Sequence, residues 1–270
     1  MAWSLARWLA VVAWTGVLAA CSSNARPGTP PSSPSGSSAA AAGQAAPPGL
    51  GEACSSTSGV RARSMWFAAS DGVRLYGIEA GTGRTAVVLA HEGRADLCGW
   101  LPYVRTLQDA GLRVFAFDFR GYGLSESSSS ADLGLGRDLA GAVTRVRADG
   151  ATEVFLMGAS MGGAAVVQNS AGIDVAGRIS LSGTRLWRGY GVNDPAGVRR
   201  ISAPFLYVGT RDDWRAPRPE ARSVFNMIGS ADKKIVLYAG SDHGWDLVEQ
   251  PPYGAQTRAL ILRWIQARSR

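Results

Sequence analysis

The feature that most constrains this chain is the pentapeptide Gly158-Ala159-Ser160-Met161-Gly162, a G-x-S-x-G motif. It follows an apolar run at residues 153–157, which predicts a buried strand, and opens a small-residue stretch at 163–167, which predicts a helix. A serine on such a turn has a strained backbone that neighbouring glycines accommodate, and its hydroxyl projects beyond the sheet. The helix N-terminus beneath it favours a developing oxyanion. An ordinary glycine-rich turn would also fit, because the chain holds 34 glycines, so the motif needs a base and an acid.

The search for a base is short because the chain has two histidines, His91 and His243. His243 follows the apolar strand candidate at 235–238, and a loop at the C-terminal end of a strand is where an α/β sheet places its chemistry. We therefore predict His243 as the base. We predict that His91 is a structural histidine in the loop after an earlier strand.

The acid candidates come after another apolar strand, at residues 205–208, which runs into Gly209-Thr210-Arg211-Asp212-Asp213. Asp212, Asp213 and Asp242 all follow the serine in sequence, and the sequence order Ser160, Asp, His243 is one of three known orders for such triads. Each group follows a predicted strand.

Several motifs from residue 64 onward resemble the α/β-hydrolase family. Residues 87–93 are similar to its strand ending in His-Gly, residues 118–125 to its D-x-R-G-x-G-x-S stretch, and 209–212 to its G-x-x-D stretch. The resemblance favours Asp212 as the acid over its neighbour Asp213 and over Asp242. It also implies two backbone N–H donors for an oxyanion, at Met161 and at Gly93.

The resemblance has one departure, at Glu92, where the family usually has glycine. A glutamate here is similar to dienelactone-hydrolase-like members, whose cysteine nucleophile is replaced by Ser160. Glu92 is either a surface charge or a group that enters the site. Asp118 and Arg120, in the D-x-R-G stretch, are expected to fix a turn.

The N-terminus predicts export. Arg7 precedes an apolar run at 8–20 that is too short to span a bilayer, and Leu18-Ala19-Ala20-Cys21 looks like a bacterial lipobox. We predict a signal peptide at 1–20, lipidation of Cys21 and a flexible Ser/Ala/Pro/Gly tether at 21–51, because such a composition cannot bury enough apolar surface to fold. The folded domain is then expected at 52–270, outside the cell membrane. An ordinary secretory signal is the alternative.

Composition bears on partners and cofactors. With Cys21 lipidated, Cys54 and Cys98 remain as one candidate disulfide in an oxidising compartment. No Cys/His cluster has metal-ligand spacing, so we expect no metal and no organic cofactor. The net charge is +7, but arginines are scattered rather than grouped with aromatics, which argues against nucleic acid.

Alternating strand and helix candidates predict a doubly wound, mostly parallel sheet with helices on both faces. Asp71-Gly72 predicts an antiparallel hairpin at its start. The segment 183–203 is too short for a helical cap domain. Strands are expected at 64–69, 73–78, 86–91, 113–118, 153–158, 178–182, 204–209 and 234–238, and helices at 100–110, 135–147, 220–228 and 256–266.

These features together favour a serine hydrolase that cleaves small-molecule or lipid carboxylic esters, with thioesters and amides as further acyl donors. An acyltransferase with the same triad, or a non-catalytic envelope lipoprotein that binds a ligand, are the alternatives. Trp100, Trp187, Trp214 and Trp245 are either core residues or the walls of an apolar pocket. The sequence leaves the oligomeric state open.

Overall fold

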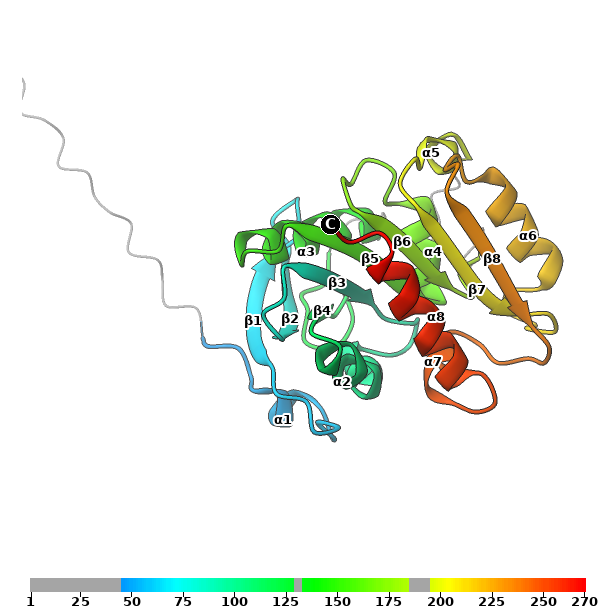
Figure 1. Cartoon of the computed structure of the whole chain (residues 1–270). Coiled ribbons are helices and arrows are strands. Elements are labelled where there is room, and N and C mark those ends of the chain that lie inside the picture. Colours follow the sequence, from blue (N-terminus) through cyan, green and yellow to red (C-terminus); the bar gives the residue numbers. More distant parts are fainter. Residues whose placement is uncertain (1–44, 129–132, 185–194) are drawn as a thin grey trace, which may run out of the picture. The chain divides into compact units, whose positions relative to one another are not determined.

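An eight-stranded sheet forms the centre of the folded unit, which runs from Ala45 to Arg270 (Figure 1). The computed structural model describes residues 45–128, 133–184 and 195–270. The predicted signal peptide, Cys21, the tether up to residue 44 and Trp187 lie outside these ranges. The strands are β1 (Arg63–Ala68), β2 (Arg74–Ala80), β3 (Thr85–Ala90), β4 (Arg113–Phe117), β5 (Glu153–Ala159), β6 (Gly177–Leu181), β7 (Phe205–Thr210) and β8 (Lys233–Tyr238).

The strand order is β1-β2-β4-β3-β5-β6-β7-β8. β1 pairs with β2, and β2 with β4, in antiparallel fashion, while every other pair is parallel. The turn between β1 and β2 is closed by the amide of Gly72, which donates to the carbonyl of Ala69 at 2.9 Å. The predicted fold class, a mostly parallel sheet with an antiparallel hairpin at its start, is confirmed.

Helices cover both faces of the sheet, as Figure 1 shows. One face carries α1 (Leu50–Ala53), α2 (Leu101–Asp109), α7 (Asp246–Glu249) and α8 (Gly254–Gln266), and a short 3-10 helix, η1 (Leu97–Trp100), leads into α2. The other face carries α3 (Leu135–Ala148), α4 (Met161–Gln168), α5 (Pro195–Arg200) and α6 (Arg218–Met227). Among the described residues, the segment between β6 and β7 contributes only the short α5.

The central strands divide their side chains between two apolar cores. In β3, Val87 and Leu89 pack with α2 and α8, while Ala86 and Val88 pack with α3 and α4. Side chains that alternate in direction, with helices on both faces, leave no solvent-exposed face for a central strand. This explains why these strands read as continuous apolar runs in the sequence.

The folded unit begins earlier than the sequence predicts. The sequence predicts a flexible tether at residues 45–51, but Trp66 Nε1 donates to the carbonyl of Ala45 at 3.1 Å, and the Tyr76 hydroxyl lies 2.9 Å from the carbonyl of Pro48. Leu50 is buried in α1. The predicted boundary at Glu52 is therefore wrong: the composition is that of a tether, but two aromatic side chains of the first hairpin bind its backbone.

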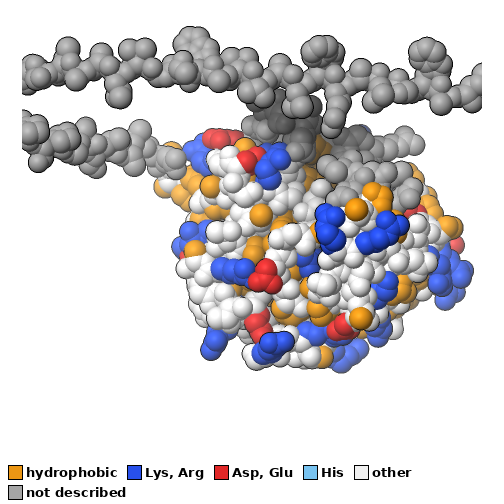
Figure 2. Space-filling view, turned by 90° about the horizontal axis from the view of Figure 1, so that it is seen from above, with side chains coloured by type: hydrophobic (Ala, Val, Ile, Leu, Met, Phe, Trp, Pro, Cys, Tyr) orange, Lys and Arg blue, Asp and Glu red, His pale blue; other side chains and the backbone are white. Residues whose placement is uncertain are grey.

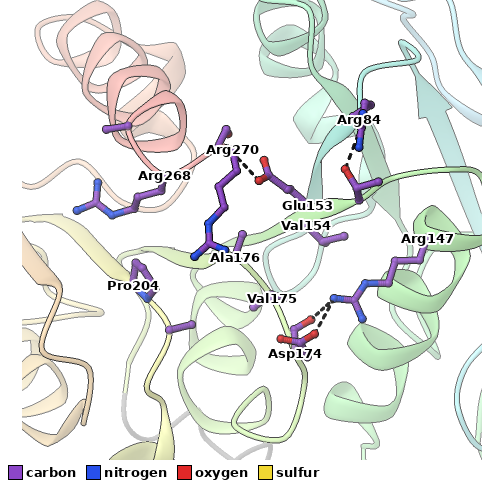
Figure 3. Close-up of a pocket in the computed structure, with 14 residues that line it drawn as sticks. Arg84, Arg147, Glu153, Val154, Asp174, Val175, Ala176, Pro204, Arg268 and Arg270 are labelled. Atoms are coloured by element: carbon purple, nitrogen blue, oxygen red, sulfur yellow. Dashed lines mark hydrogen bonds and ion pairs between the residues drawn. The ribbon is translucent and has the colours of Figure 1, made fainter.

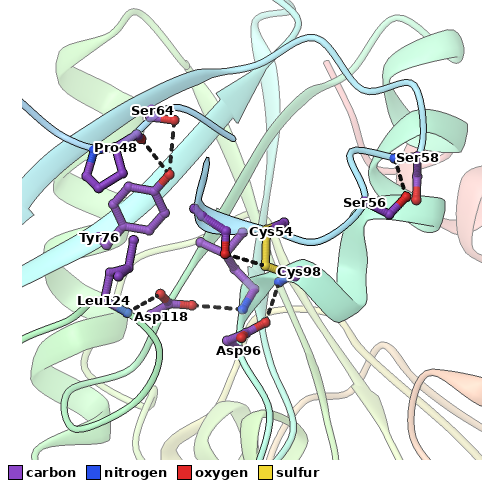
Figure 4. Close-up of a disulfide and its surroundings, with 12 residues drawn as sticks. Pro48, Cys54, Ser56, Ser58, Ser64, Tyr76, Asp96, Cys98, Asp118 and Leu124 are labelled. Carbon is purple, nitrogen blue, oxygen red and sulfur yellow. Dashed lines mark hydrogen bonds between the residues drawn. A yellow bond between two sulfur atoms is a disulfide. The ribbon is translucent and has the colours of Figure 1, made fainter. Parts of the chain in front are cut away.

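A disulfide joins Cys54 to Cys98, as predicted, with the two Cα atoms 5.7 Å apart (Figure 4). It fixes the start of the folded chain to η1, in the loop that follows β3. Nearby, Asp118 accepts the amides of Leu97 at 2.8 Å and Leu124 at 2.9 Å. A bridge across a sequence separation of 44 residues stabilises the fold by about 4 kcal/mol in the chain-entropy model.

Within the described ranges, none of the helices combines the length and the apolar character that a membrane span needs.

Candidate active site

Ser160 stands between the end of β5 and the start of α4, in a left-handed backbone conformation with φ of 50°. A non-glycine residue there is strained, and such strain concentrates at functional turns. The surrounding hydrogen bonds hold it: the amide of Ser160 donates to the carbonyl of Leu181 at 2.9 Å, and the amide of Ala164 donates to the carbonyl of Ser160 at 2.8 Å. The G-x-S-x-G sequence thus forms the predicted turn.

The two glycines of the motif are required by close backbone approach. A Cβ at Gly158 would lie 2.3 Å from the carbonyl carbon of Gly162, and a Cβ at Gly162 would lie 2.2 Å from the carbonyl oxygen of Ala90. Both distances are shorter than any real carbon contact, so a side chain at either position would force the turn apart. The spacing of the motif is therefore set by how closely β5 and α4 meet.

His243 meets Ser160 across a short hydrogen bond. Its Nε2 lies 2.8 Å from Ser160 Oγ, although the two residues are separated by 83 positions in the sequence. His243 lies in the loop from β8 to α7, and Thr210 Oγ1 supports that loop by donating to the carbonyl of Asp242 at 2.8 Å. Both partners are almost fully buried, so bulk water does not compete for their bond. The structure places His243 where a base for Ser160 must be.

The acid beside His243 is Asp213, and the prediction of Asp212 is wrong. Asp213 Oδ2 lies 2.7 Å from His243 Nδ1, and Asp213 is 1 % exposed. Asp212 is exposed, and its amide donates to the carbonyl of Gly240 at 3.0 Å. After β7 ends at Thr210, the chain turns so that the second aspartate, not the first, faces inward. Asp242 makes no contact of this kind among the described residues.

Asp213 is held in place by its other oxygen. Oδ1 accepts the amide of Arg215 at 2.9 Å and that of Ala216 at 3.2 Å. Burial works to raise the pKa of Asp213, but the hydrogen bond from His243, its charge and these two amides outweigh it, so the pKa lies below its ordinary value. Asp213 is therefore an ionised carboxylate that can orient the imidazole and stabilise its charged form.

The two amides predicted to bind an oxyanion lie on neighbouring segments, the start of α4 and the loop after β3. Met161 is the first residue of α4, where helix amides have no partner within the helix. Gly93 lies in the loop after β3, and that loop contacts the serine turn through the carbonyl of His91, which accepts the amide of Gly162 at 3.1 Å. Neither amide has a hydrogen-bond acceptor within the described part of the chain.

His91 has the structural role that the sequence suggested. Its Nδ1 lies 2.6 Å from the carbonyl of Glu92, and its Nε2 lies 3.0 Å from the amide of Phe119, which donates to it. Burial lowers the pKa of His91 to about 4, so the ring is neutral near neutral pH. A neutral ring with both nitrogens engaged in backbone contacts ties β3 to the loop after β4 and has no free nitrogen for proton transfer.

Glu92 enters the site region rather than facing solvent. Its Oε1 accepts the amide of Trp245, two residues after His243, at 2.8 Å. Burial raises the pKa of Glu92 above its ordinary value, although the Trp245 amide and His243 oppose that rise. The sequence alone is compatible with a surface charge or with a group that enters the site. The contact with Trp245, 153 positions away in the sequence, decides between these two roles.

The tryptophans fall into two groups. Trp100 is fully buried, and Trp245 packs on its ring with centroids 5.8 Å apart, so both belong to the core beneath η1. Trp214 is 73 % exposed, directly after the acid, and the guanidinium of Arg215 lies 4.2 Å from its ring centroid.

Arg120 contributes to the fold through charge. It is buried and binds Asp138, with Nη2 2.7 Å and Nε 2.8 Å from Oδ1, and it also contacts Asp71 at 2.8 Å. The start of the chain segment after β4 is thereby tied to α3, as expected for the D-x-R-G stretch. The sequence did not identify its partner Asp138, which lies on α3.

A separate cavity lies at the opposite end of the sheet (Figure 3). Its volume is about 820 Å³, and it is lined by residues at the N-terminal ends of β5, β6 and β7. Arg147 donates there to Asp174 at 3.2 Å, and the amide of Arg270 donates to Glu153 at 2.6 Å. None of Ser160, Asp213 and His243 lines this cavity, because they follow the C-terminal ends of their strands.

Charged side chains do not gather into one stripe on the face shown in Figure 2. Lys and Arg side chains are spread over it, and several stand beside Asp or Glu. In the described ranges, no group of three or more His, Cys, Asp or Glu side chains is placed to hold a metal ion.

Solved structures share this fold. An esterase from Pyrococcus furiosus superposes with a TM-score of 0.68 at 14 % sequence identity, covering 78 % of this chain and 92 % of that one. An esterase from Exiguobacterium antarcticum superposes with a TM-score of 0.64 at 17 % sequence identity, covering 76 % of this chain and 100 % of that one. At these identities the likeness concerns the fold.

Comparison with protein sequences gives the family. The uncharacterised protein YfhR of Escherichia coli K12 is 34 % identical over 134 residues, which is 46 % of this chain and 45 % of that protein. This chain thus spans less than half the length of the relatives it matches. The model of the alpha/beta hydrolase family matches residues 87–226, just over half of the chain, and includes the serine turn and Asp213. The chain belongs to the alpha/beta hydrolase family.

Proposed function

We propose that the protein is a serine hydrolase that cleaves carboxylic esters through an acyl-enzyme on Ser160. The observation that carries the proposal is the unbroken hydrogen-bond chain from Ser160 Oγ through His243 to Asp213, with links of 2.8 and 2.7 Å. A serine hydroxyl is a weak nucleophile until a base takes its proton, and this chain supplies both the base and the carboxylate that orients it.

The chemistry then runs in two halves. Ser160 Oγ attacks the carbonyl carbon while His243 Nε2 takes its proton, and the resulting oxyanion is bound by the amides of Met161 and Gly93. The intermediate collapses, the alcohol leaves with the proton from Nε2, and the acyl group stays on Ser160. A water molecule repeats the sequence, which releases the acid and restores the serine.

Two other functions use the same fold and are separated by the same assay. In an acyltransferase, an added alcohol would intercept the acyl-enzyme and yield a new ester instead of a free acid. A binding module would form no covalent adduct with a serine-reactive phosphonate. Support for catalysis comes from the three buried and mutually bonded groups, because a binding protein has no physical need for a strained serine paired with a base.

The first test is fluorophosphonate labelling of the full chain purified in a mild detergent. The wild type is expected to label, whereas Ser160→Ala and His243→Ala are expected to lose labelling, the first because the nucleophile is absent and the second because its base is absent. Mass spectrometry of the adduct checks the site. Circular dichroism of each variant controls for folding. A folded wild type that does not label would contradict the proposal.

We also propose that the protein is exported and lipid-anchored at Cys21, on the outer face of the cell membrane. The support is the Leu18-Ala19-Ala20-Cys21 sequence, together with the disulfide between Cys54 and Cys98, a bond that persists in oxidising compartments. An ester substrate that resides in or near the membrane would then lie within reach of the site.

The anchor is tested by expressing the full chain and Cys21→Ala in a bacterial host supplied with an alkyne-labelled fatty acid. The wild type is expected in the membrane fraction carrying the label, and the variant is expected to carry none. An unlabelled wild type that is released in soluble form would show that an ordinary secretory signal was present instead.

A further inference from the structure

Glu92 lies between the two loops that present the nucleophile and the base. It directly follows His91, whose carbonyl accepts the amide of Gly162 at 3.1 Å, in the serine turn. Its own side chain accepts the amide of Trp245 at 2.8 Å, in the loop that carries His243. Two consecutive residues therefore contact the turn that carries Ser160 and the loop that carries His243.

The contact of Glu92 with the histidine loop is close as well as polar. Gly244, the residue after His243, has a φ of 58°, and a Cβ built there would lie 1.6 Å from Glu92 Oε1. The carboxylate occupies the space that any other residue at 244 would need for its side chain. Glu92 thus touches the two residues that follow the base, from the side of the serine turn.

The other supports of this loop lie elsewhere. Thr210 holds the carbonyl of Asp242 from the side of β7, and the Trp245 indole packs over Gly99, where a Cβ would lie 2.2 Å from the ring. Between them, the amide of Trp245 has the carboxylate of Glu92 as its acceptor. At 2.8 Å this contact has the length of a well-formed hydrogen bond.

We propose that Glu92 is a positioning residue, whose carboxylate holds the His243 loop so that Nε2 stays in line with Ser160 Oγ. The inference rests on the proposed hydrolase function. It gives a role to the residue that departs from the family pattern: a glycine there would leave the Trp245 amide without this acceptor. Small displacements of a base are costly, because proton transfer depends on the geometry of the reacting groups.

The test uses hydrolysis of p-nitrophenyl acetate by the full chain, with the concentration of active sites set by fluorophosphonate titration. Glu92→Ala is expected to lower kcat about 10- to 100-fold with KM little changed, since the substrate pocket stays intact. Glu92→Gln keeps an oxygen that accepts from Trp245, so it is expected to restore most of kcat. A loss of stability alone would not lower kcat per active site while leaving KM unchanged.

Gly244 provides a second, independent arm with a matched control. Gly244→Ala is expected to lower kcat strongly, because its new methyl group displaces the carboxylate. Gly240→Ala is the control: Gly240 lies in the same loop with φ of 89°, but a Cβ there meets nothing within 4 Å. When Glu92 is already alanine, Gly244→Ala should lower kcat by no more than Gly240→Ala does. A double-mutant cycle measures this difference.

The outcomes separate the two proposals. A wild type that neither labels nor turns over removes the hydrolase function, and this proposal with it. If the wild type labels and Glu92→Ala has the same kcat as the wild type, the role of Glu92 is overturned and the hydrolase function stands. The role of Glu92 is also overturned if Gly244→Ala lowers kcat by the same factor with and without Glu92→Ala. If Glu92→Ala fails to fold, hydrogen exchange at the Trp245 amide is measured in Glu92→Gln and Gly244→Ala instead. Faster exchange in Gly244→Ala than in the wild type supports the hydrogen bond between Glu92 and Trp245, and unchanged exchange overturns its role.

Discussion

Replacing Asp213 with asparagine is expected to lower kcat by about 10⁴-fold. Asp213 Oδ1 accepts two amides, those of Arg215 and Ala216, so the single oxygen of an asparagine would be drawn to them. Its NH₂ group would then face His243 Nδ1, which in the wild type donates to Asp213 Oδ2 over 2.7 Å. The imidazole would be forced to carry its proton on Nε2, and in that tautomer it cannot take the proton of Ser160.

Asp212→Asn is the matched control for this experiment. The two aspartates are adjacent, but Asp212 is exposed, so its change to asparagine is expected to leave kcat within about twofold of the wild type, as surface substitutions usually do. Steady-state hydrolysis of p-nitrophenyl acetate by both variants gives the comparison. If Asp212→Asn were inactive while Asp213→Asn turned over normally, the acid assigned from the geometry would be wrong.

The largest effect on stability is expected at Arg120. Arg120→Met keeps much of the side-chain volume but removes the charge that compensates Asp138, which is fully buried. Leaving a buried charge without its partner typically costs about 3–5 kcal/mol, because the carboxylate can neither hydrate nor pair. Urea denaturation of the wild type and the variant measures this loss, and Asp138→Asn in the Arg120→Met background should recover part of it.

The pH dependence of this variant has a definite sign. Burial raises the pKa of Asp138 to about 6 in the folded protein, and removing Arg120 raises it further. An aspartate in the unfolded chain has a pKa of about 3.9. Above that pH the folded variant binds more protons than the unfolded chain, so the stability of the variant falls as pH rises. The cost of Arg120→Met should be smaller at pH 5 than at pH 8.

The surface ion pair between Arg137 and Asp71, with Nε 2.7 Å from Oδ2, is the control. Both side chains are partly exposed, so Arg137→Met is expected to cost at most about 1 kcal/mol. Equal losses for Arg120→Met and Arg137→Met would contradict the importance given to burial.

The fold and most of the site follow from local sequence. Apolar runs locate the strands, and the G-x-S-x-G turn with only two histidines leaves a short list of candidates. The choice between Asp212 and Asp213 could not be made in this way, because both follow the end of β7, where side-chain alternation no longer applies. Which carboxylate turns inward depends on the backbone of an irregular loop.

Contacts between distant segments account for the remaining differences. The backbone of residues 45–51 is bound by Trp66 and Tyr76, and the role of Glu92 depends on Trp245. No composition window or periodicity contains both members of such a pair. These features become visible only when the sheet brings the segments together.

The position of β8 has a consequence for how the protein fails. β8 has a single neighbour, β7, and most of its residues are only partly buried, yet the loop that follows it carries His243. Marginal strands fray before the interior of a domain opens, since local openings require less free energy than global unfolding. We therefore expect activity to be lost before the fold: mild stress should displace the His243 loop while the core around β3 and β5 stays folded, and removing the stress should restore activity without global refolding.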